Sequence, residues 1–268
     1  MRPETPTPKD GAAWITGASS GIGKATALRL AGEGWTVFAS ARSGDKLIDV
    51  AREADSLDGE ILPMPADVTS QDDVRAAVDR IEGSHGGIAL AILNAGTFTM
   101  DSVNQFDADS FKRQVDVNYL GVINCLQPLL PHLLQRRRGH IAIMASVAGY
   151  SGLPLSMGYC ATKAALINLS ESLFLECRPY NVKVQVINPG FVRTELTDRN
   201  RFPMPFLMDL DTAADALVAG LKRPRFEIAF PRFFAFMLKR LRAMPYWLYF
   251  ALVARATGVN NRAKRRER

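Results

Sequence analysis

The sequence predicts an α/β protein built on a doubly wound parallel sheet. Short apolar runs of strand length alternate with segments of helical periodicity from about residue 12 to residue 190. Several of these runs are mostly apolar, and 88–93 (IALAIL) contains no polar residue, as expected of a strand that is buried on both faces. These two observations together favour strands and helices that alternate around one parallel sheet.

Each predicted element has its own local signal. The strands are expected at residues 12–16, 36–41, 60–66, 88–93, 140–145 and 183–187. A first helix follows the glycine-rich turn and ends at Gly32 and Gly34, and further helices are expected at 45–54, 70–81, 111–134 and 161–178. In the 70–81 helix Ser70 is a suitable N-cap, and the apolar residues recur at helical spacing.

Composition limits the class of protein. The 268 residues are 47% hydrophobic and 22% charged, which is typical of a globular chain with one large core. The three cysteines and three histidines show no ligand spacing, so we expect neither a disulfide framework nor a metal site. The first residues contain no apolar run of signal-peptide length, so the prediction is a cytoplasmic protein.

The chain divides into three predicted parts. Residues 1–10 carry three prolines and are expected to form a flexible lead-in. The α/β domain is expected over 11–225, and its segment at about 190–210 is expected to be a loop, with prolines at 203 and 205. Residues 226–268 form a basic, aromatic-rich, amphipathic C-terminal extension. The loop contains apolar residues that could form an adaptable wall for a bulky lipophilic molecule or could equally pack on the protein's own core: Phe202, Met204, Phe206, Leu207 and Met208.

A glycine-rich turn joins the first predicted strand to the first helix. The segment 16–23 has the sequence TGASSGIG, in which Gly17, Gly21 and Gly23 permit a tight turn. Such a turn lets the backbone approach a pyrophosphate at the helix N-terminus, although glycine-rich βα loops also occur without a ligand. The strand–turn–helix context favours a dinucleotide site.

The end of the second strand indicates which dinucleotide binds. A carboxylate at this place usually binds the ribose 2′-hydroxyl of NAD, whereas an arginine accommodates the 2′-phosphate of NADP. Arg42 stands there, and no carboxylate occurs before Asp45. An arginine that merely faces solvent is the alternative. We therefore predict NADP(H) as the cofactor.

A candidate catalytic group follows the later strands. Tyr159 and Lys163 are four residues apart, so on a helix they lie on one face, and a nearby ammonium can lower the pKa of a phenol. Ser146 follows a strand and could bond a substrate oxygen, or cap a turn. Asn118 lies inside a predicted helix, where asparagine has no propensity advantage.

These residues resemble the motifs of the short-chain dehydrogenase/reductase family. The resemblance covers residues 11–195 in family order and spacing, with one departure at Leu93, where the family often has asparagine. It implies a Rossmann fold over 11–225, an oxidoreductase, and a substrate lid formed by the loop at about 190–210. The matching segments are TGASSGIG at 16–23, Asp67-Val68, Asn94-Ala95-Gly96, Asn118, Ser146, Tyr159 with Lys163, and Pro189-Gly190 with Thr194.

The resemblance also implies roles. Tyr159 would protonate the carbonyl oxygen, Lys163 would lower the pKa of Tyr159 and bond the nicotinamide ribose, Ser146 would orient the carbonyl, and Asn118 would hold a relay water. The residues expected to bind the cofactor are Gly17, Ser19, Ser20, Gly21, Ile22, Gly23, Arg42, Asp67, Val68, Asn94, Ala95, Gly96, Tyr159, Lys163, Pro189, Gly190, Val192 and Thr194. In this family the helix after Ser146 often forms a subunit interface, so a homodimer or homotetramer is expected.

The C-terminal extension carries most of the positive charge. From Lys222 to the end there are 13 lysines and arginines against two acids, whereas the rest of the chain is mildly acidic. Two short amphipathic helices broken at Pro245 could lie on an anionic membrane surface, cover the active-site mouth or form a subunit interface. The last seven residues could instead be a solvated tail. A nucleic-acid partner is not expected, because no known binding module accompanies the charge.

Two functions are consistent with the sequence. The first is an NADPH-dependent reductase of an apolar ketone or aldehyde, a small molecule, that also oxidises the alcohol in reverse. The second is a non-catalytic dinucleotide-binding membrane adaptor or redox sensor, which would not need the full set of Asn118, Ser146, Tyr159 and Lys163. The sequence does not specify the substrate.

Overall fold

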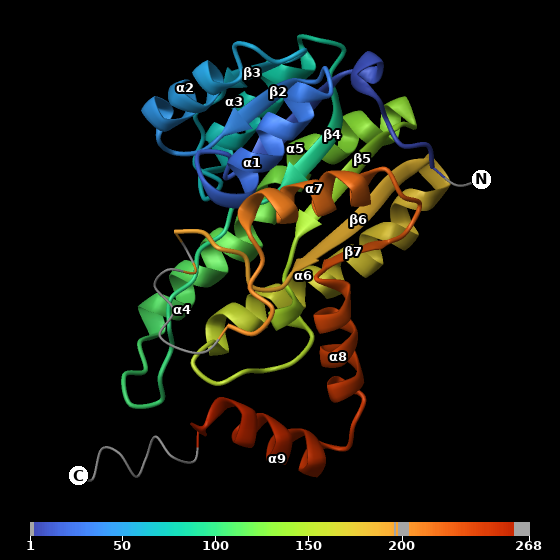
Figure 1. The fold of residues 1–268 in the computed structure, drawn as a ribbon. Helices are drawn as coiled ribbons and strands as arrows, with labels where there is room; N and C mark the ends of the chain where they lie inside the picture. The colour runs from blue at the N-terminus through green and yellow to red at the C-terminus, as the bar shows by residue number, and fades with distance from the viewer. Residues whose placement is uncertain (1–2, 196, 198–203, 260–268) are drawn as a thin grey trace.

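The computed structural model describes residues 3–195, 197 and 204–259. One seven-stranded sheet of parallel strands forms the centre of the molecule, in the order β3-β2-β1-β4-β5-β6-β7 (Figure 1). The strands are β1 (Ala12–Thr16), β2 (Thr36–Ser40), β3 (Glu60–Pro63), β4 (Ile88–Leu93), β5 (Gly139–Met144), β6 (Val182–Pro189) and β7 (Glu227–Phe230). The strand order reverses between β1 and β4, which confirms the predicted doubly wound sheet.

Helices cover both faces of the sheet and enclose two hydrophobic cores. One core lies under α1 (Gly21–Gly32), α2 (Gly44–Glu53) and α7 (Leu210–Leu221). The other lies under α3 (Gln71–Glu82), α5 (Gly121–Arg136) and α6 (Met157–Cys177). All residues of β1, β4, β5 and β6 are buried, as the unbroken apolar run of β4 predicted for that strand. In β5 and β6 the buried residues include the polar side chains of His140, Lys183 and Gln185.

The predicted long helix at 111–134 is three consecutive segments. The chain forms α4 (Ala108–Val115), one π-helical turn (Asp116–Leu120) and then α5. Asn118 lies in the π-helical turn and is fully buried. Such turns inside α-helices are frequent at functional sites, and helical periodicity alone does not reveal them.

The expected domain boundary after residue 225 cuts through the sheet. Neither α7 nor β7 was predicted, and β7 pairs with β6 from Val186 opposite Glu227 to Pro189 opposite Phe230. The C-terminal extension therefore supplies the last strand and then two helices, α8 (Arg232–Arg242) and α9 (Tyr246–Thr257), which separate at Pro245 as expected.

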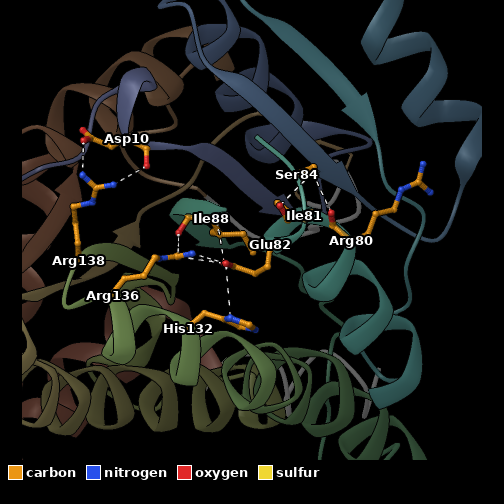
Figure 2. Close-up of polar contacts among 9 residues, drawn as sticks. All are labelled: Asp10, Arg80, Ile81, Glu82, Ser84, Ile88, His132, Arg136 and Arg138. Atoms are coloured by element: carbon orange, nitrogen blue, oxygen red, sulfur yellow. Dashed lines mark hydrogen bonds and ion pairs between the residues drawn. The ribbon is translucent and has the colours of Figure 1, made fainter. Parts of the chain in front are cut away.

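The lead-in is held against the body over its described part, so the prediction of a flexible segment does not hold there. The Asp10 carboxylate accepts a hydrogen bond from Arg138 at 3.0 Å (Figure 2), and the Lys183 amine donates to the Thr5 hydroxyl at 2.8 Å. Figure 2 also shows Arg136, which pairs with the buried Glu82 side chain at this amino-terminal edge of the sheet. Polar contacts at this amino-terminal edge thus hold the lead-in and the helices in place, whereas the candidate active site lies at the opposite, carboxyl edge.

Candidate active site

A cleft of about 1190 Å³ opens at the carboxyl ends of the strands, where the strand order reverses. The sheet register explains why chemically active residues meet there. Thr16 lies opposite Ser40, Leu93 opposite Ile143, and Pro189 opposite Phe230. The segments that follow these strands therefore leave the sheet at one edge. Most predicted site residues line this cleft, namely Gly17, Ser19, Ser20, Gly21, Ile22, Gly23, Arg42, Asp67, Val68, Asn94, Ala95, Gly96, Tyr159, Lys163, Pro189 and Thr194.

The glycine turn has the geometry that a pyrophosphate site needs. Gly17 has φ +67° and Gly21 has φ +52°, a conformation that glycine adopts without strain. A Cβ atom on Gly23 would lie 2.2 Å from the Gly17 carbonyl oxygen, so only glycine fits there. The Asn94 amide donates to the carbonyls of Thr16 and Gly17 at 3.0 Å and holds the turn. The free N–H groups at the start of α1 thus face the cleft, which fits an anionic dinucleotide.

Basic side chains border the cleft at the end of β2. Arg42 is exposed and makes no hydrogen bond or ion pair with any described residue. Lys46, which sequence analysis missed, lines the cleft one turn further on, and Ser43 caps α2 by accepting from the Lys46 N–H. A signal was available, because Lys46 lies four residues after Arg42 at the start of a helix. Two unpaired cations at this place fit a phosphate on the adenosine ribose.

The adenine side of the cleft is built from the segment after β3. The Asp67 carboxylate accepts from the Thr69 N–H at 2.9 Å and from its hydroxyl at 2.8 Å, so it shapes its own loop. Asn124 on α5 donates to the Val68 carbonyl at 2.9 Å. Thr69 and Asn124 also line the cleft and were not predicted, because nothing local in the sequence relates α5 to this loop.

Tyr159, Lys163 and Ser146 come together at the other end of the cleft. Tyr159 and Lys163 lie in the first two turns of α6, and the Lys163 amine is 5.6 Å from the centre of the Tyr159 ring. The same amine donates to the Met144 carbonyl at the end of β5, at 2.7 Å. Ser146 follows β5, and its hydroxyl accepts a hydrogen bond from the Ala148 N–H at 3.1 Å and donates one to the Pro189 carbonyl at 3.3 Å.

Burial decides the protonation of these groups. It raises the pKa of Tyr159 to about 12, and a hydrogen bond with the Ser146 hydroxyl only partly offsets this rise. Burial also lowers the pKa of Lys163 to about 7. In this structure burial outweighs any lowering of the Tyr159 pKa by Lys163, because the pKa of the buried amine is itself lowered to about 7. Tyr159 is protonated at pH 7 and can donate a proton.

Asn118 organises the loop beside the catalytic group. Its side-chain oxygen accepts from the Thr97 N–H at 2.7 Å, and its amide donates to the Thr97 carbonyl at 3.0 Å and to the Thr162 hydroxyl at 3.1 Å. The side chain thus joins the segment after β4 to α6. A Cβ on Gly96 would lie 3.3 Å from the Asn118 oxygen and 3.6 Å from the Lys163 amine, so this loop passes close to both.

Four predicted residues lie beside the cleft rather than on its wall, namely Asn118, Ser146, Gly190 and Val192. Gly190 faces α8, where an added Cβ would lie 3.0 Å from the Phe234 ring. Val192 is buried and forms a bridge with Met208, so the described part of the lid folds back on the chain after β6. The predicted lid residue Phe202 lies outside the described residues.

No metal chemistry is indicated in the part of the chain that the structure describes. Within it, no group of three or more histidine, cysteine or acidic side chains could hold a metal ion. All three cysteines are free and buried. No helix of the described residues is long and apolar enough to cross a membrane.

Comparison with known proteins gives concordant matches. The family described as short chain dehydrogenase matches residues 11–203. An uncharacterized oxidoreductase from Myxococcus xanthus is 35% identical over 91% of this chain and 96% of its own. A 3-oxoacyl-[acyl-carrier-protein] reductase from Thermotoga maritima is 34% identical over 69% of this chain and 75% of its own. A 3-ketodihydrosphingosine reductase from Bacteroides thetaiotaomicron is 33% identical over 78% of this chain and 73% of its own.

Solved structures agree with these matches. A short-chain dehydrogenase from Sphingobium yanoikuyae in complex with NADPH has a TM-score of 0.76, 30% identity, and coverage of 83% of this chain and 88% of its own. A short chain dehydrogenase from Burkholderia cenocepacia in complex with NADP has a TM-score of 0.80, 27% identity, and coverage of 92% and 99%. The fold, the glycine turn and the family match together show that this chain belongs to the short-chain dehydrogenase family of oxidoreductases.

Proposed function

We propose that the protein is an NADPH-dependent reductase of apolar ketones or aldehydes that also oxidises the corresponding alcohols. The observation that carries this proposal is the arrangement of one cleft. Ser146, Tyr159 and Lys163 gather at one end of it, and the unpaired Arg42 lies at the other. A dinucleotide held along the glycine turn would connect the two ends.

The chain's own residues would hold the cofactor in a defined direction. The N–H groups at the start of α1 and the turn 17–23 would bind the pyrophosphate, and Arg42 with Lys46 would bind the 2′-phosphate. Pro189 and Thr194 would border the nicotinamide. When bound, NADPH supplies the hydride for the reduction. The solved relatives described with NADPH and NADP support this choice.

The proton would come from Tyr159. Its high pKa keeps the hydroxyl protonated at pH 7, so it can donate to a carbonyl oxygen that gains charge. Ser146, whose hydroxyl lowers the pKa of Tyr159, would orient the same oxygen. Lys163 would bond the nicotinamide ribose and stabilise the phenolate after proton transfer. Asn118 would position the loop at Thr97 and would hold, beside Lys163, the water through which protons are relayed.

Aromatic side chains around the catalytic end favour an apolar substrate. The Phe98 ring lies edge-on to Tyr159 with a centre-to-centre distance of 5.3 Å. Phe191 and Phe206 both contact Phe234 of α8, at 6.0 and 5.4 Å. Two of the relatives are named as a 3-oxoacyl-[acyl-carrier-protein] reductase and a 3-ketodihydrosphingosine reductase. A ketone on a long hydrocarbon chain is therefore the proposed substrate class.

We also propose a homodimer or homotetramer, with α6 at the subunit interface. Leu175 on α6 is 66% exposed, and this helix lies at the molecular surface. The non-catalytic adaptor is the weaker alternative, because it gives no reason for a buried lysine beside Tyr159 and Ser146.

Oxidation of NADPH and NADH in the presence of ketones of increasing chain length tests the proposal. We expect turnover with NADPH that rises with chain length, and loss of turnover in Tyr159→Phe with NADPH binding retained. The matched control is Tyr180→Phe, which changes an exposed tyrosine just after α6 and should retain full activity. Tight NADPH binding without turnover of any ketone or aldehyde would favour the adaptor instead.

A further inference from the structure

The outer sides of α8 and α9 present an apolar, aromatic surface, which we call the C-terminal face. On α8 the exposed side chains recur at helical spacing, so they form one stripe. Trp247 on α9 is 74% exposed, and the exposed fraction of Phe233, Phe236 and Phe250 is 60–62%. The members of the face are Phe233, Phe236, Met237, Met244, Tyr246, Trp247 and Phe250. A cluster of this kind on one surface marks an interaction site.

The inner sides of the same helices fix them to the body. Phe234 and Ala235 are buried against Val147, in a small core of their own. The Tyr249 hydroxyl donates to the Gly152 carbonyl at 2.6 Å and ties α9 to the loop after β5. The exposed rings therefore stand on anchored helices, and their exposure is a property of the folded molecule.

A network of polar side chains adds a second anchor for α8. The Lys239 amine forms an ion pair with Glu227 on β7, and it lies 5.2 Å from the centre of the Tyr150 ring. The Tyr150 hydroxyl and the Asn188 amide donate to the same carboxylate, at 2.6 and 2.8 Å. Lys239 is thereby used within the protein and is not available to a partner.

The remaining charge on the C-terminal face is positive and unpaired. No acidic residue occurs from 228 to 259. Four arginines of this segment make no ion pair with any described residue, namely Arg232, Arg240, Arg242 and Arg255. Aromatic rings flanked by arginines suit the boundary between headgroups and acyl chains of an anionic bilayer. A second copy of this face would bring arginines against arginines, so like charges oppose self-association.

The C-terminal face lies on the same side of the molecule as the cleft. Figure 1 shows α8 descending from β7, and α9 and the loop before α4 reaching one end of the molecule, beyond the carboxyl ends of the strands. That loop also carries exposed apolar residues, with Val103 78% and Phe106 64% exposed. Phe206, which belongs to the predicted lid, packs edge-on against Phe233 with 5.8 Å between ring centres.

We propose that the C-terminal face docks on an anionic lipid surface and turns the carboxyl edge of the sheet toward the bilayer. This inference goes beyond the proposed reductase activity and does not depend on which carbonyl compound is reduced. The end of the chain, 260–268, lies outside the described residues and adds five bases to one acid in sequence. In such an orientation an apolar substrate would reach the site from the lipid phase.

Vesicle flotation of the full chain tests the docking directly. One set of vesicles is phosphatidylcholine alone, and the other is phosphatidylcholine mixed equally with phosphatidylglycerol. We expect flotation with the anionic vesicles, weak recovery with the neutral ones, and release by salt. Each base near the surface contributes roughly fivefold to partitioning, so the triple variant Arg232→Gln/Arg240→Gln/Arg255→Gln should lose on the order of 100-fold.

A second variant tests the apolar contribution separately. Phe236→Ser/Trp247→Ser removes two exposed rings, so the fold should be kept while flotation with anionic vesicles falls. The matched control removes three exposed bases at the far side of the molecule, Lys9→Gln/Arg75→Gln/Arg80→Gln, and should float like the unmodified chain.

Three results would overturn the proposal. The first is no flotation of the unmodified chain with anionic vesicles. The second is an equal loss in the control variant, which would assign the effect to net charge alone. The third is unchanged flotation of the ring variant together with a smaller oligomer in sedimentation velocity, which would make the C-terminal face a subunit interface.

Discussion

A buried carboxylate positions the first turn of the catalytic helix. Asp101 is 3% exposed, and its carboxylate accepts from the Gly158 N–H at 2.8 Å, one residue before Tyr159. The fully buried Gln114 donates to the same carboxylate at 3.2 Å, and the Asp101 N–H donates to the Leu155 carbonyl at 3.1 Å. Asp101 thus joins the loop after β4, α4 and the start of α6, and we infer that it positions Tyr159.

Removal of this carboxylate leaves two buried donors without an acceptor. Each such donor costs about 1–3 kcal/mol, so Asp101→Ala should lose about 3 kcal/mol of unfolding free energy. For a chain of this size, that corresponds to roughly 6–12 °C in Tm. Because a displacement of about 1 Å at a reacting group can cost on the order of 100-fold, kcat should fall about tenfold or more. The KM for NADPH should change little, since the pyrophosphate turn is on a different loop.

Two further variants separate positioning from general loosening. Asp101→Asn retains an oxygen that can accept from Gly158, so it should recover most of kcat. In Gly158→Ala, the added Cβ would lie 2.9 Å from the Gln114 amide and 3.2 Å from the Asp101 carboxylate. It should lower kcat although alanine favours a helix by about 1 kcal/mol over glycine.

Thermal unfolding and steady-state kinetics with one ketone measure all three variants. The reasoning is refuted if Asp101→Ala is folded and keeps the kcat of the unmodified enzyme. It is also refuted if the KM for NADPH rises by the same factor as kcat falls, because the effect would then extend to the whole cleft.

Two other predictions follow from the cleft and from the buried lysines. Arg42→Ala should raise the KM for NADPH about 10- to 100-fold and leave that for NADH unchanged, since a charge-assisted contact to a phosphate is worth about 1.5–3 kcal/mol. Unfolding free energy should rise with pH between about 7 and 9, by up to about 1.4 kcal/mol per pH unit for each buried lysine. Burial lowers the pKa of Lys163 to about 7 and that of Lys183 to about 8, whereas both lysines titrate near 10.5 when unfolded, so the folded chain binds fewer protons over this range.

Both predictions have controls. Arg52→Ala removes an exposed arginine of α2 that pairs with Asp49, and it should not alter either KM. Equal increases of both KM values in Arg42→Ala would contradict the phosphate assignment. Urea unfolding at several pH values measures the second prediction, and Lys183→Met should flatten the rise. A slope that is zero or negative between pH 7 and 9 in the unmodified chain would be inconsistent with buried lysines of lowered pKa. Above pH 9 the buried thiols, whose pKa values burial raises, act in the opposite direction.

The sequence predicted the sheet up to β6 because short, mostly apolar runs alternate with segments of helical periodicity over that part of the chain. These runs and the caps such as Ser70 are local signals, and the structure retains them. The strand β7 gave no such signal. It has four residues, and one of them, Glu227, is charged and half-buried. Its place in the sheet depends on Tyr150, Asn188 and Lys239, which satisfy that carboxylate from distant parts of the chain.

The site shows the same division between local and distant information. The glycine turn and the pair Tyr159 and Lys163 each lie within one short segment, so their spacing predicts their geometry. Asn124 and Asp101 reach the cleft or the catalytic helix only through tertiary contacts. The sequence also does not show how deeply Tyr159 and Lys163 are buried, and this burial shifts both pKa values.

Asn118 explains why local propensity fails where the site is built. A regular helix from α4 into α5 would be favoured by an alanine or leucine at this position, and asparagine in a π-helical turn is locally unfavourable. In return, its side chain makes three hydrogen bonds, two to the Thr97 backbone and one to the Thr162 hydroxyl. Thr162 in turn donates to the Tyr159 carbonyl at 2.8 Å, so the irregular turn is connected to the proton donor through one side chain. A local rule is therefore broken at the point where loop, helix and catalytic tyrosine must be held together, which is where such violations are expected in enzymes.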